Sequence, residues 1–220
     1  MPGFDEMRAE RDSLDTIWMN GEFTDWEDAT THVLTHGLHY GTGIFEGVRC
    51  YDTERGPAVF RWDDHLERFF ASGKPYDMEI PFSRAELTDA TLELITRNGL
   101  ESCYIRPVAY YGYDQLGVSP GDCPVDVAAK TTGLYVNSLL AGEEARRNGY
   151  EEAIVLNKEG NVAEGPGENV FIVRDGELYT PALSESILDG ITRDTVITLA
   201  EERDIPVHET TVSRGELNTA

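Results

Sequence analysis

The spacing of hydrophobic positions predicts short strands, mostly in hairpins, with a few helices between them. One helix is expected to be capped by Asp63 and to end near Gly73. A second is expected to begin at the capping-box sequence 83–86 and to end at Asn98-Gly99. β-branched and aromatic residues bounded by turn residues predict the strands of this half: 16–20, 48–51, 58–60 and 103–111. Pro107 lacks an N–H donor, so it predicts an edge or a bulge in the last of them.

The second half of the chain shows the same mixture of elements. Residues 112–124 are rich in Gly, Asp and Pro, which is typical of a surface loop and makes them the best candidate for a domain boundary. Two helices and four strands are expected after it: 134–147 and 190–202, then 153–156, 170–173, 177–179 and 207–212. Hairpins between helices favour an α+β fold over a doubly wound parallel sheet. The expected organisation is a polar tail over residues 1–15, an N-terminal α+β domain over 16–124 and a C-terminal domain over 125–220.

The charge balance argues against two classes of partner. The chain of 220 residues holds 18 Lys plus Arg against 41 Asp plus Glu, a formal net charge of −23. Binding to a nucleic-acid backbone or to an anionic membrane is therefore not expected. Only three of the cations are lysines. An acidic, lysine-poor surface suits a protein in concentrated salt, because counterions screen its self-repulsion, so the hypothesis is a halophilic protein.

The cysteines and the N-terminal sequence favour a cytoplasmic location. Cys50, Cys103 and Cys123 are odd in number and lack C-x-x-C spacing, which suits reduced thiols better than a disulfide or a zinc site. The sequence from Met1 lacks the basic flank and apolar run of a secretory signal, and no stretch approaches a membrane span.

Lys130 is the first candidate for chemistry. It follows the strand-like run 125–129 and precedes small residues that leave room for a carbonyl cofactor. Partial burial of a lysine lowers its pKa enough to leave a nucleophilic amine. An ordinary lysine that faces solvent is the competing interpretation.

Three other features of the sequence could complete such a site. Glu164 stands in a loop with two glycines and a proline, and a carboxylate held against a pyridine nitrogen keeps that nitrogen protonated. A solvated β-turn is the competing interpretation. Gly190 precedes an expected helix and Thr192 lies in its first turn, so backbone N–H groups and a hydroxyl can face an anion. Arg68 could bind a phosphate in bidentate fashion, although spacing alone favours a pair with Asp64.

Together these segments resemble the branched-chain amino acid aminotransferases, fold-type IV enzymes that use pyridoxal 5′-phosphate (PLP). The stretches that carry the resemblance follow the family's order: 36–49 (HGLHYGTGIFEGVR), 104–107 (YIRP), 164–169 (EGPGEN) and 190–194 (GITRD). The resemblance extends over nearly everything from Ile17 onward. It implies a two-domain fold like that of D-amino acid aminotransferase, with the second, PLP-binding domain incomplete in this chain.

The resemblance also implies a role for each matched residue. Lys130 would be the catalytic lysine, which bonds to the cofactor and then moves a proton between the substrate Cα and the cofactor C4′. Glu164 would pair with the pyridinium nitrogen and Tyr135 with the phenolate oxygen, while Tyr40 would reach a neighbouring subunit's site. The implied cofactor-binding residues are Arg68, Lys130, Tyr135, Glu164, Leu188, Ile191 and Thr192. The implied substrate residues are Tyr40, Phe45, Gly47, Tyr104 and Arg106.

The implied reaction moves the amino group of L-leucine, L-isoleucine or L-valine to 2-oxoglutarate, which yields a branched-chain 2-oxo acid and L-glutamate. Arg106 is the candidate to bind the distal carboxylate of 2-oxoglutarate. A homo-oligomer is implied, since the family's sites lie at subunit contacts. D-amino acid aminotransferase, R-selective amine transaminase and aminodeoxychorismate lyase are alternatives within the PLP enzymes, and a truncated, inactive paralogue is an alternative outside catalysis.

Two departures from the family pattern stand out. Several tens of residues normally separate the loop near 117–120 from the catalytic lysine, whereas here 125–128 runs almost directly into Lys130. The missing stretch carries the interdomain linker and pocket residues. The chain also stops at 217–220, before a family segment that helps to bind the phosphate and the substrate carboxylate. The family assignment is therefore a firmer expectation than turnover by this chain.

Three histidines raise the question of a metal site. His32, His36 and His39 have i, i+4 and i+7 spacing, which on a helix would place three imidazoles on one face. The residues between them do not sustain a helix, so hydrogen-bonding roles around a pocket are expected instead. The sequence has no D-x-D-x-D-G calcium loop. No metal is expected.

Overall fold

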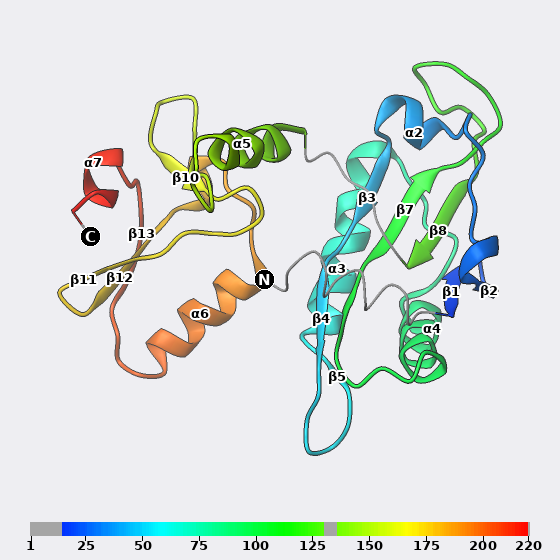
Figure 1. Ribbon diagram of the computed structural model, residues 1–220, viewed down its shortest axis with the longest axis horizontal. Coiled ribbons are helices and arrows are strands. Elements are labelled where there is room, and N and C mark those ends of the chain that lie inside the picture. Colours follow the sequence, from blue (N-terminus) through cyan, green and yellow to red (C-terminus); the bar gives the residue numbers. More distant parts are fainter. Residues whose placement is uncertain (1–14, 130–135, 220) are drawn as a thin grey trace. The chain divides into compact units, whose positions relative to one another are not determined.

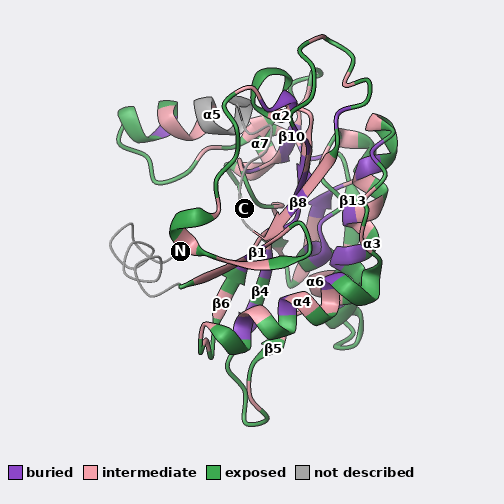
Figure 2. Ribbon diagram, turned by 90° about the vertical axis from the view of Figure 1, so that its right-hand side faces the viewer, coloured by how far each residue is buried: buried purple, intermediate pink, exposed green. Residues whose placement is uncertain are grey.

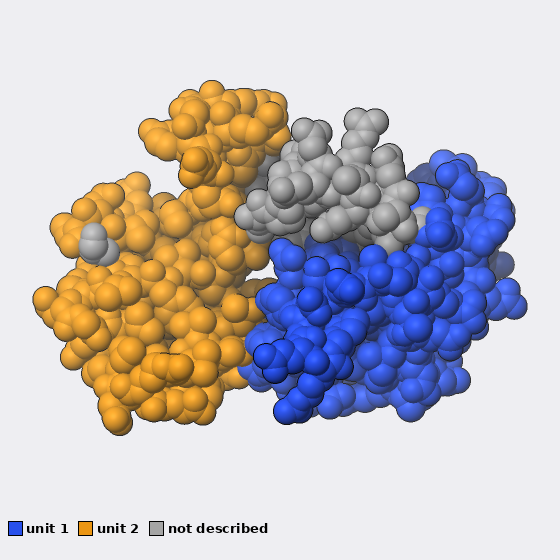
Figure 3. All heavy atoms as spheres, turned by 60° about the horizontal axis from the view of Figure 1, so that its bottom comes forward, with its two compact units in different colours: residues 1–133 blue, residues 134–220 orange. Residues whose placement is uncertain are grey.

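The computed structural model describes residues 15–129 and 136–219, which fall into two compact units. Unit 1 comprises residues 1–133 and unit 2 residues 134–220, coloured blue and orange in Figure 3. The division differs from the expected boundary after residue 124, because strand β8 (Val125–Ala129) pairs with strands of unit 1.

A five-stranded antiparallel sheet forms the centre of unit 1 (Figure 1). Its order is β2 (Glu22–Asp25), β1 (Thr16–Met19), β8, β7 (Pro107–Tyr111) and β3 (Gly43–Phe45). The strand expected at the start of this unit is confirmed as β1, which pairs with β2 across Asn20 and Gly21, whose φ angles are +50° and +93°. Positive φ at both turn positions matches the right-handed twist of a hairpin.

A second, three-stranded sheet continues two of these strands. Its order is β5 (Ala58–Val59), β4 (Val48–Tyr51) and β6 (Cys103–Ile105), which confirms the expected hairpin of residues 48–60. The expected strand 103–111 is interrupted at Arg106, where the chain passes from the second sheet to the first. Of the two positions expected for Pro107, an edge or a bulge, the edge is wrong, since β7 lies between β8 and β3; Pro107 instead directly follows the interruption at Arg106. Pro107 is tolerated there as the first residue of its strand.

Helices cover the sheets of unit 1. Helix α4 (Arg84–Arg97) packs against β1, and α3 (Trp62–Gly73) packs against β3. The capping box of α4 is confirmed, because Ser83 Oγ accepts from the Glu86 N–H while Glu86 accepts from the Ser83 N–H. Asp63 is not a cap; Arg61 precedes α3 with φ +46°, and Asp63 lies in the first turn. The remaining helical turns are α2 (His36–Tyr40), η1 (Trp26–Asp28) and η2 (Lys74–Tyr76).

The core of unit 1 lies between these helices and the large sheet. Leu66 and Phe69 of α3 are buried, as are Leu87 of α4 and Trp18 and Val127 of the sheet. Figure 2 shows the corresponding pattern on α4, where buried and exposed residues alternate along the helix. A helix with one apolar face is stabilised chiefly by this packing.

The described residues of unit 2 form two small sheets, three α-helices and one short 3₁₀ helix. Its helical elements are α5 (Val136–Arg147), η3 (Leu183–Glu185), α6 (Ile191–Glu201) and α7 (Arg214–Leu217). Its sheets are β9 (Val155–Leu156) with β10 (Val162–Glu164), and β11 (Ile172–Arg174) with β12 (Glu177–Pro181) and β13 (Val207–Thr210). The β11–β12 hairpin confirms the sequence prediction, and α6 connects β12 to the parallel strand β13. The mixture of hairpins and helices is the expected α+β class.

None of the helices in the described ranges is long and apolar enough to cross a membrane.

Candidate active site

Four of the expected substrate residues gather where two neighbouring strands change sheets. β3 ends at Phe45 and β4 begins at Val48, while β6 ends at Ile105 and β7 begins at Pro107. The two interruptions face each other, and the Glu46 N–H donates to the Pro107 carbonyl at 3.0 Å. The residues brought to this crossing are Phe45, Gly47, Tyr104 and Arg106.

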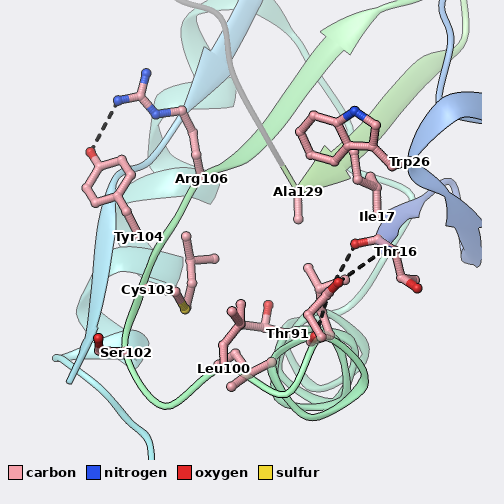
Figure 4. A pocket seen from close by; sticks show the side chains of 14 residues that line it. Thr16, Ile17, Trp26, Thr91, Leu100, Ser102, Cys103, Tyr104, Arg106 and Ala129 are labelled. Atoms are coloured by element: carbon pink, nitrogen blue, oxygen red, sulfur yellow. Dashed lines mark hydrogen bonds between the residues drawn. The ribbon is translucent and has the colours of Figure 1, made fainter. Parts of the chain in front are cut away.

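Tyr104 is the residue that joins this group, because it contacts both Gly47 and Arg106. A Cβ atom on Gly47 would overlap the Tyr104 hydroxyl, so only glycine leaves room for this ring. Arg106 donates to Tyr104 Oη at 3.2 Å (Figure 4) and lies 4.9 Å from the centre of the Phe45 ring. Arg106 Nε is buried and has no hydrogen-bond partner within the described residues. A cation beside aromatic rings suits an apolar ligand that carries an anionic group.

A buried ion-pair network holds Arg68. The Glu46 side chain is only 3% exposed, and its two oxygens accept from Nε and Nη2 of Arg68, each at 2.7 Å. His65 Nδ1 lies 2.7 Å from Glu46 Oε2. The competing pair of Arg68 with Asp64 is not formed, since Asp64 pairs with Arg61 at 2.6 Å. The bidentate geometry fixes the orientation of the guanidinium of Arg68.

This network lowers the pKa of Glu46. Burial alone would raise the pKa of the carboxyl group, but hydrogen bonds and charge from Arg68 and His65 outweigh burial and hold the pKa below its ordinary value. Sequence reasoning missed both Glu46 and His65. The sequence did contain a sign of Glu46. In a strand, alternate residues point to the same face, and Glu46 lies between Ile44 and Val48, which are 5% and 0% exposed. A charged side chain on the buried face of a strand requires an oppositely charged or hydrogen-bonding partner.

Tyr40 lies at the end of helix α2, apart from the strand crossing. Tyr40 is 42% exposed, and its ring lies at a tilt beside the His36 ring, with 4.5 Å between the ring centres. His36 is fully buried, with Nδ1 bonded to Thr42 at 2.7 Å and Nε2 to the Gly117 carbonyl at 2.8 Å. His39 bonds the Val33 carbonyl at 3.0 Å. The histidines therefore have the hydrogen-bonding roles expected of them, and no cluster of three metal-ligating side chains occurs within the described ranges.

The acidic loop of unit 2 orients Glu164. Glu164 is the last residue of β10, and its Oε2 accepts the Leu188 N–H at 2.9 Å. Asn169 Nδ2 donates to the Leu188 carbonyl at 3.0 Å and reaches the same Glu164 oxygen at 3.4 Å. No hydrogen bond to Glu164 Oε1 is found within the described part of the chain. One carboxylate oxygen is thus fixed by the backbone, while the other can face a ligand. Asn169 was not singled out from the sequence.

The chain then leads directly into the N-terminus of α6. Gly190 is the N-cap and provides no side-chain cap, and Ile191 and Thr192 begin the helix. Thr192 is exposed, whereas Ile191 is 9% exposed. The Gly190 Cα faces Asn169, where a Cβ would overlap Oδ1 of the amide. The positive end of the helix dipole and the backbone N–H groups of its first turn suit an anion such as a phosphate.

Two side chains near this helix start have different surroundings. Leu188, expected to pack on the cofactor ring, is 58% exposed beside Glu164. Arg193 is 4% exposed; its guanidinium donates to the Pro181 carbonyl at 3.0 Å and pairs with Glu209 at 2.6 Å. Arg193 thereby fixes the first turn of α6 to strands β12 and β13. The end of β10 and the start of α6 therefore lie next to each other in unit 2. Together they carry four of the expected cofactor residues: Glu164, Leu188, Ile191 and Thr192.

The donor set of unit 2 fits a phosphorylated pyridine. A half-exposed carboxylate with one oxygen held in place suits a ring nitrogen, and the neighbouring helix start suits the phosphate. Lys130 and Tyr135, expected to bond the cofactor directly, lie outside the described residues.

The family model "Amino-transferase class IV" matches residues 43–128 and 121–220. The branched-chain-amino-acid aminotransferase of Pseudomonas aeruginosa is 41% identical over 249 residues, which cover 96% of this chain and 80% of the relative. A solved structure of the Escherichia coli branched-chain amino acid aminotransferase has a TM-score of 0.89 at 42% identity, covering 93% of this chain and 79% of that one. The solved structure of a T.th. branched-chain amino acid aminotransferase complexed with N-(5′-phosphopyridoxyl)-L-glutamate has a TM-score of 0.87 at 43% identity, covering 93% and 78%.

The comparisons also bear on the expected internal shortening. A match of 249 residues is longer than the whole chain of 220, so the relative has residues within the match that this chain lacks. The family model matches in two pieces that meet at residues 121–128, just before Lys130. These observations agree with the shortening expected at that point. With a family model over most of its length and relatives above 40% identity, the chain belongs to the class IV aminotransferases, among the branched-chain amino acid aminotransferases.

Proposed function

We propose that this protein transfers the amino group of L-leucine, L-isoleucine or L-valine to 2-oxoglutarate. Its cofactor is pyridoxal 5′-phosphate, as in the similar structures that hold PLP or its derivatives. The observation that carries the proposal is the joint anchoring of Glu164 and the start of α6: the Leu188 N–H fixes the carboxylate two residues before Gly190 caps the helix. An acid and an anion site held by one short segment are what a phosphorylated pyridine requires.

When bound, PLP supplies an electron-poor ring that accepts the charge left when the substrate Cα loses its proton. Glu164 would keep the ring nitrogen protonated, because a carboxylate fixed beside that nitrogen favours its positively charged form. Thr192 and the first N–H groups of α6 would hold the phosphate, with Ile191 in the same turn. The exposed side chain of Leu188 would pack on the ring.

Lys130 and Tyr135 have roles that rest on the family resemblance. Lys130 would bond to the cofactor, give way to the substrate amine and then move the proton between Cα and C4′. Tyr135, five residues later, would hydrogen-bond the phenolate oxygen. Arg68 would contribute to the phosphate site, with its guanidinium oriented by Glu46.

The strand crossing of unit 1 would supply the substrate side. Phe45 offers an apolar surface for a branched side chain, and Gly47 leaves room for Tyr104 against it. Arg106 would bind the distal carboxylate of 2-oxoglutarate or L-glutamate, since its Nε is buried without a partner among the described residues. The L-glutamate moiety in the phosphopyridoxyl complex of the similar enzyme supports this pair of co-substrates.

The proposal includes a homo-oligomer and a cytoplasmic location. Exposed hydrophobic side chains gather around α2 and the loop after β7: Val33, Leu38, Tyr40, Tyr113, Leu116 and Val118. Such a patch is typical of a surface that contacts a partner, and a second copy would bring Tyr40 to a neighbouring site. None of the three cysteines forms a disulfide within the described residues, which suits a reducing compartment. The acidic surface suits a salt-rich one.

The test is a stoichiometric assay of the full chain, loaded with PLP in molar KCl. L-leucine and 2-oxoglutarate should yield 4-methyl-2-oxopentanoate and L-glutamate in equal amounts, and Lys130→Ala should yield neither. Faster turnover of D-alanine than of L-leucine would reassign the chain to the D-amino acid aminotransferases. A folded protein that binds PLP but exchanges no amino group would identify an impaired paralogue.

A further inference from the structure

Cys50 and Cys103 face each other across two strands. In the β4–β6 ladder their Cα atoms are direct register partners, next to the pair Arg49–Tyr104. Both side chains lie on the face that packs against Ile95 of α4. Direct partners in an antiparallel pair have Cα atoms about 4.5–5.5 Å apart, within the roughly 4.4–6.8 Å that a disulfide spans.

The two thiols are neighbours in the sheet, and hydrogen bonding by the Cys103 side chain and the Ala58 backbone would lower the pKa of the Cys50 thiol. Burial outweighs these bonds and raises the pKa of the Cys50 thiol. Cys50 is 1% exposed and is therefore protected from reagents in solution. It can be reached by its partner on β6, but not directly by an oxidant.

Cys103 is the accessible member of the pair. It is partly exposed and lines a cavity of about 170 Å³ in unit 1, beside Thr91, Leu100 and Ala129 (Figure 4). A cavity of this size admits a small oxidant, since a single water needs only about 10–15 Å³ of such volume. The pair thus combines one thiol open to a cavity with a second, sheltered thiol in contact with the first.

We propose that Cys50 and Cys103 form a redox-active dithiol that closes to a disulfide when hydrogen peroxide reaches Cys103 through this cavity. The Cys103 sulfur attacks one peroxide oxygen, the O–O bond breaks, and hydroxide leaves and takes up the thiol proton to become water. The Cys50 sulfur then attacks the Cys103 sulfur, the S–O bond breaks, and the second hydroxide leaves with the Cys50 proton as water. Two thiols are oxidised by two electrons, and one peroxide is reduced to two waters.

The disulfide would act on the strand crossing. Tyr104 follows Cys103 directly, and its hydroxyl packs on Gly47 and accepts from Arg106. Drawing β6 toward β4 at Cys103 constrains the position of this tyrosine. That consequence rests on the proposed function, whereas closure of the dithiol does not. Mass measurement of the disulfide therefore separates the two.

The experiment treats the reduced full-length protein, in molar KCl, with a few equivalents of hydrogen peroxide. Remaining thiols are blocked with N-ethylmaleimide, and the protein is digested without reduction and mapped by mass spectrometry. We expect one linked peptide pair that contains Cys50 and Cys103, two hydrogens lighter than the reduced pair, within a single chain on a non-reducing gel. Dithiothreitol should restore both thiols.

Cys123 supplies the matched control. It is 6% exposed, and its Sγ contacts the Gln115 carbonyl at 3.6 Å rather than another thiol. Cys123→Ser should form the disulfide like the parent, while Cys103→Ser should keep Cys50 as a free thiol at the same peroxide dose. The proposal is overturned if Cys103 is oxidised without linkage to Cys50, if it links only to another chain or to Cys123, or if it stays reduced. Circular dichroism of each variant checks that the fold is intact.

Discussion

Gly47 and Tyr104 are in such close contact that a single added methyl group on Gly47 would overlap the tyrosine hydroxyl. The contact joins the two strands at the point where both change sheets. Replacement Gly47→Ala must therefore displace the ring, together with the Arg106 side chain that donates to it. We expect the KM for L-leucine to rise roughly tenfold, about 1.4 kcal/mol, because the substrate side is disturbed.

Steady-state kinetics and PLP titration check this prediction together. PLP affinity should be unchanged, since the contact lies outside the proposed cofactor residues. Gly142→Ala is the matched control, because its Cβ meets open space on helix α5. An unchanged KM in Gly47→Ala would show that Tyr104 has no part in substrate binding.

Glu46 should contribute to stability through its ion pairs with Arg68 and His65. Replacement Glu46→Gln removes a buried charge that pairs with both Arg68 and His65, so we expect a loss of about 3 kcal/mol in the free energy of unfolding at neutral pH. Glu93→Gln, which breaks an exposed pair with Arg97, should cost no more than about 0.5 kcal/mol. Urea denaturation in molar KCl measures both.

The same pair predicts a pH dependence. The folded-state pKa of Glu46 is below its ordinary value of 4.5, so the folded state binds this proton less readily than the unfolded state does. Its contribution is therefore present above about pH 4.5 and is lost as the pH falls through the folded-state pKa. The stability difference between the parent and Glu46→Gln should shrink on acidification below that pH. A difference that stays constant from pH 7 to pH 3 would contradict this account.

The parts of the fold that local chemistry determines were predictable from sequence. The Ser83–Glu86 capping box closes within four residues, so its helix start was predicted correctly. The start of α3 was not, because the turn out of β5 places Arg61 at φ +46° and moves the cap away from Asp63. Strand β8 joins unit 1 through pairing with β1 and β7, a long-range contact that a loop-rich composition before it does not reveal.

The candidate site also has a part that was predictable from sequence and a part that was not. Motif positions such as Glu164 and Thr192 were identifiable because their residue types suit an acid and an anion site. The residues that contact the site residues were harder to predict from sequence. Arg68 has an acid four residues before it in Asp64, and only the tertiary structure shows that Glu46, 22 residues away, is its partner. Asn169 likewise acts through backbone contacts with Leu188 that follow from the folded loop.

Gly190 should be required for cofactor affinity. Its φ of −80° suits any residue, so Gly190→Ala acts only through the overlap of its Cβ with Asn169 Oδ1. Moving Asn169 disturbs both Glu164 and the start of α6, and we expect PLP to bind roughly tenfold more weakly. The affinity for pyridoxal, which lacks the phosphate, should fall less than the affinity for PLP. The titration is followed by PLP absorbance.

Two further variants make the Gly190 prediction specific. Gly167→Ala, in the same loop but facing open space, should bind PLP like the parent. Adding Asn169→Ala to Gly190→Ala removes the overlapping amide and should recover part of the affinity. If Gly190→Ala binds PLP as tightly as the parent does, the helix start does not form the phosphate site.

Salt should stabilise the protein by screening its own charge. At a net charge of −23, repulsion among carboxylates opposes the compact state, and the Debye length falls from about 8 Å at 0.15 M salt to about 3 Å at 1 M. We expect the thermal midpoint, followed by circular dichroism, to rise steeply between 0.2 M and 2 M KCl. Sucrose at equal osmolality, which does not screen charge, should raise it much less. Equal effects of KCl and sucrose would remove the electrostatic explanation.

In the proposed function this chain holds PLP on Lys130 and uses it on branched-chain amino acids. The most direct measurement is borohydride reduction of the PLP-loaded full chain in molar KCl, followed by peptide mapping, with and without prior addition of L-leucine. We expect a phosphopyridoxyl group on Lys130, and loss of that label when L-leucine is added first without 2-oxoglutarate. A folded chain that gains no label, or is labelled at Lys74 or Lys158 instead, would contradict the proposed function.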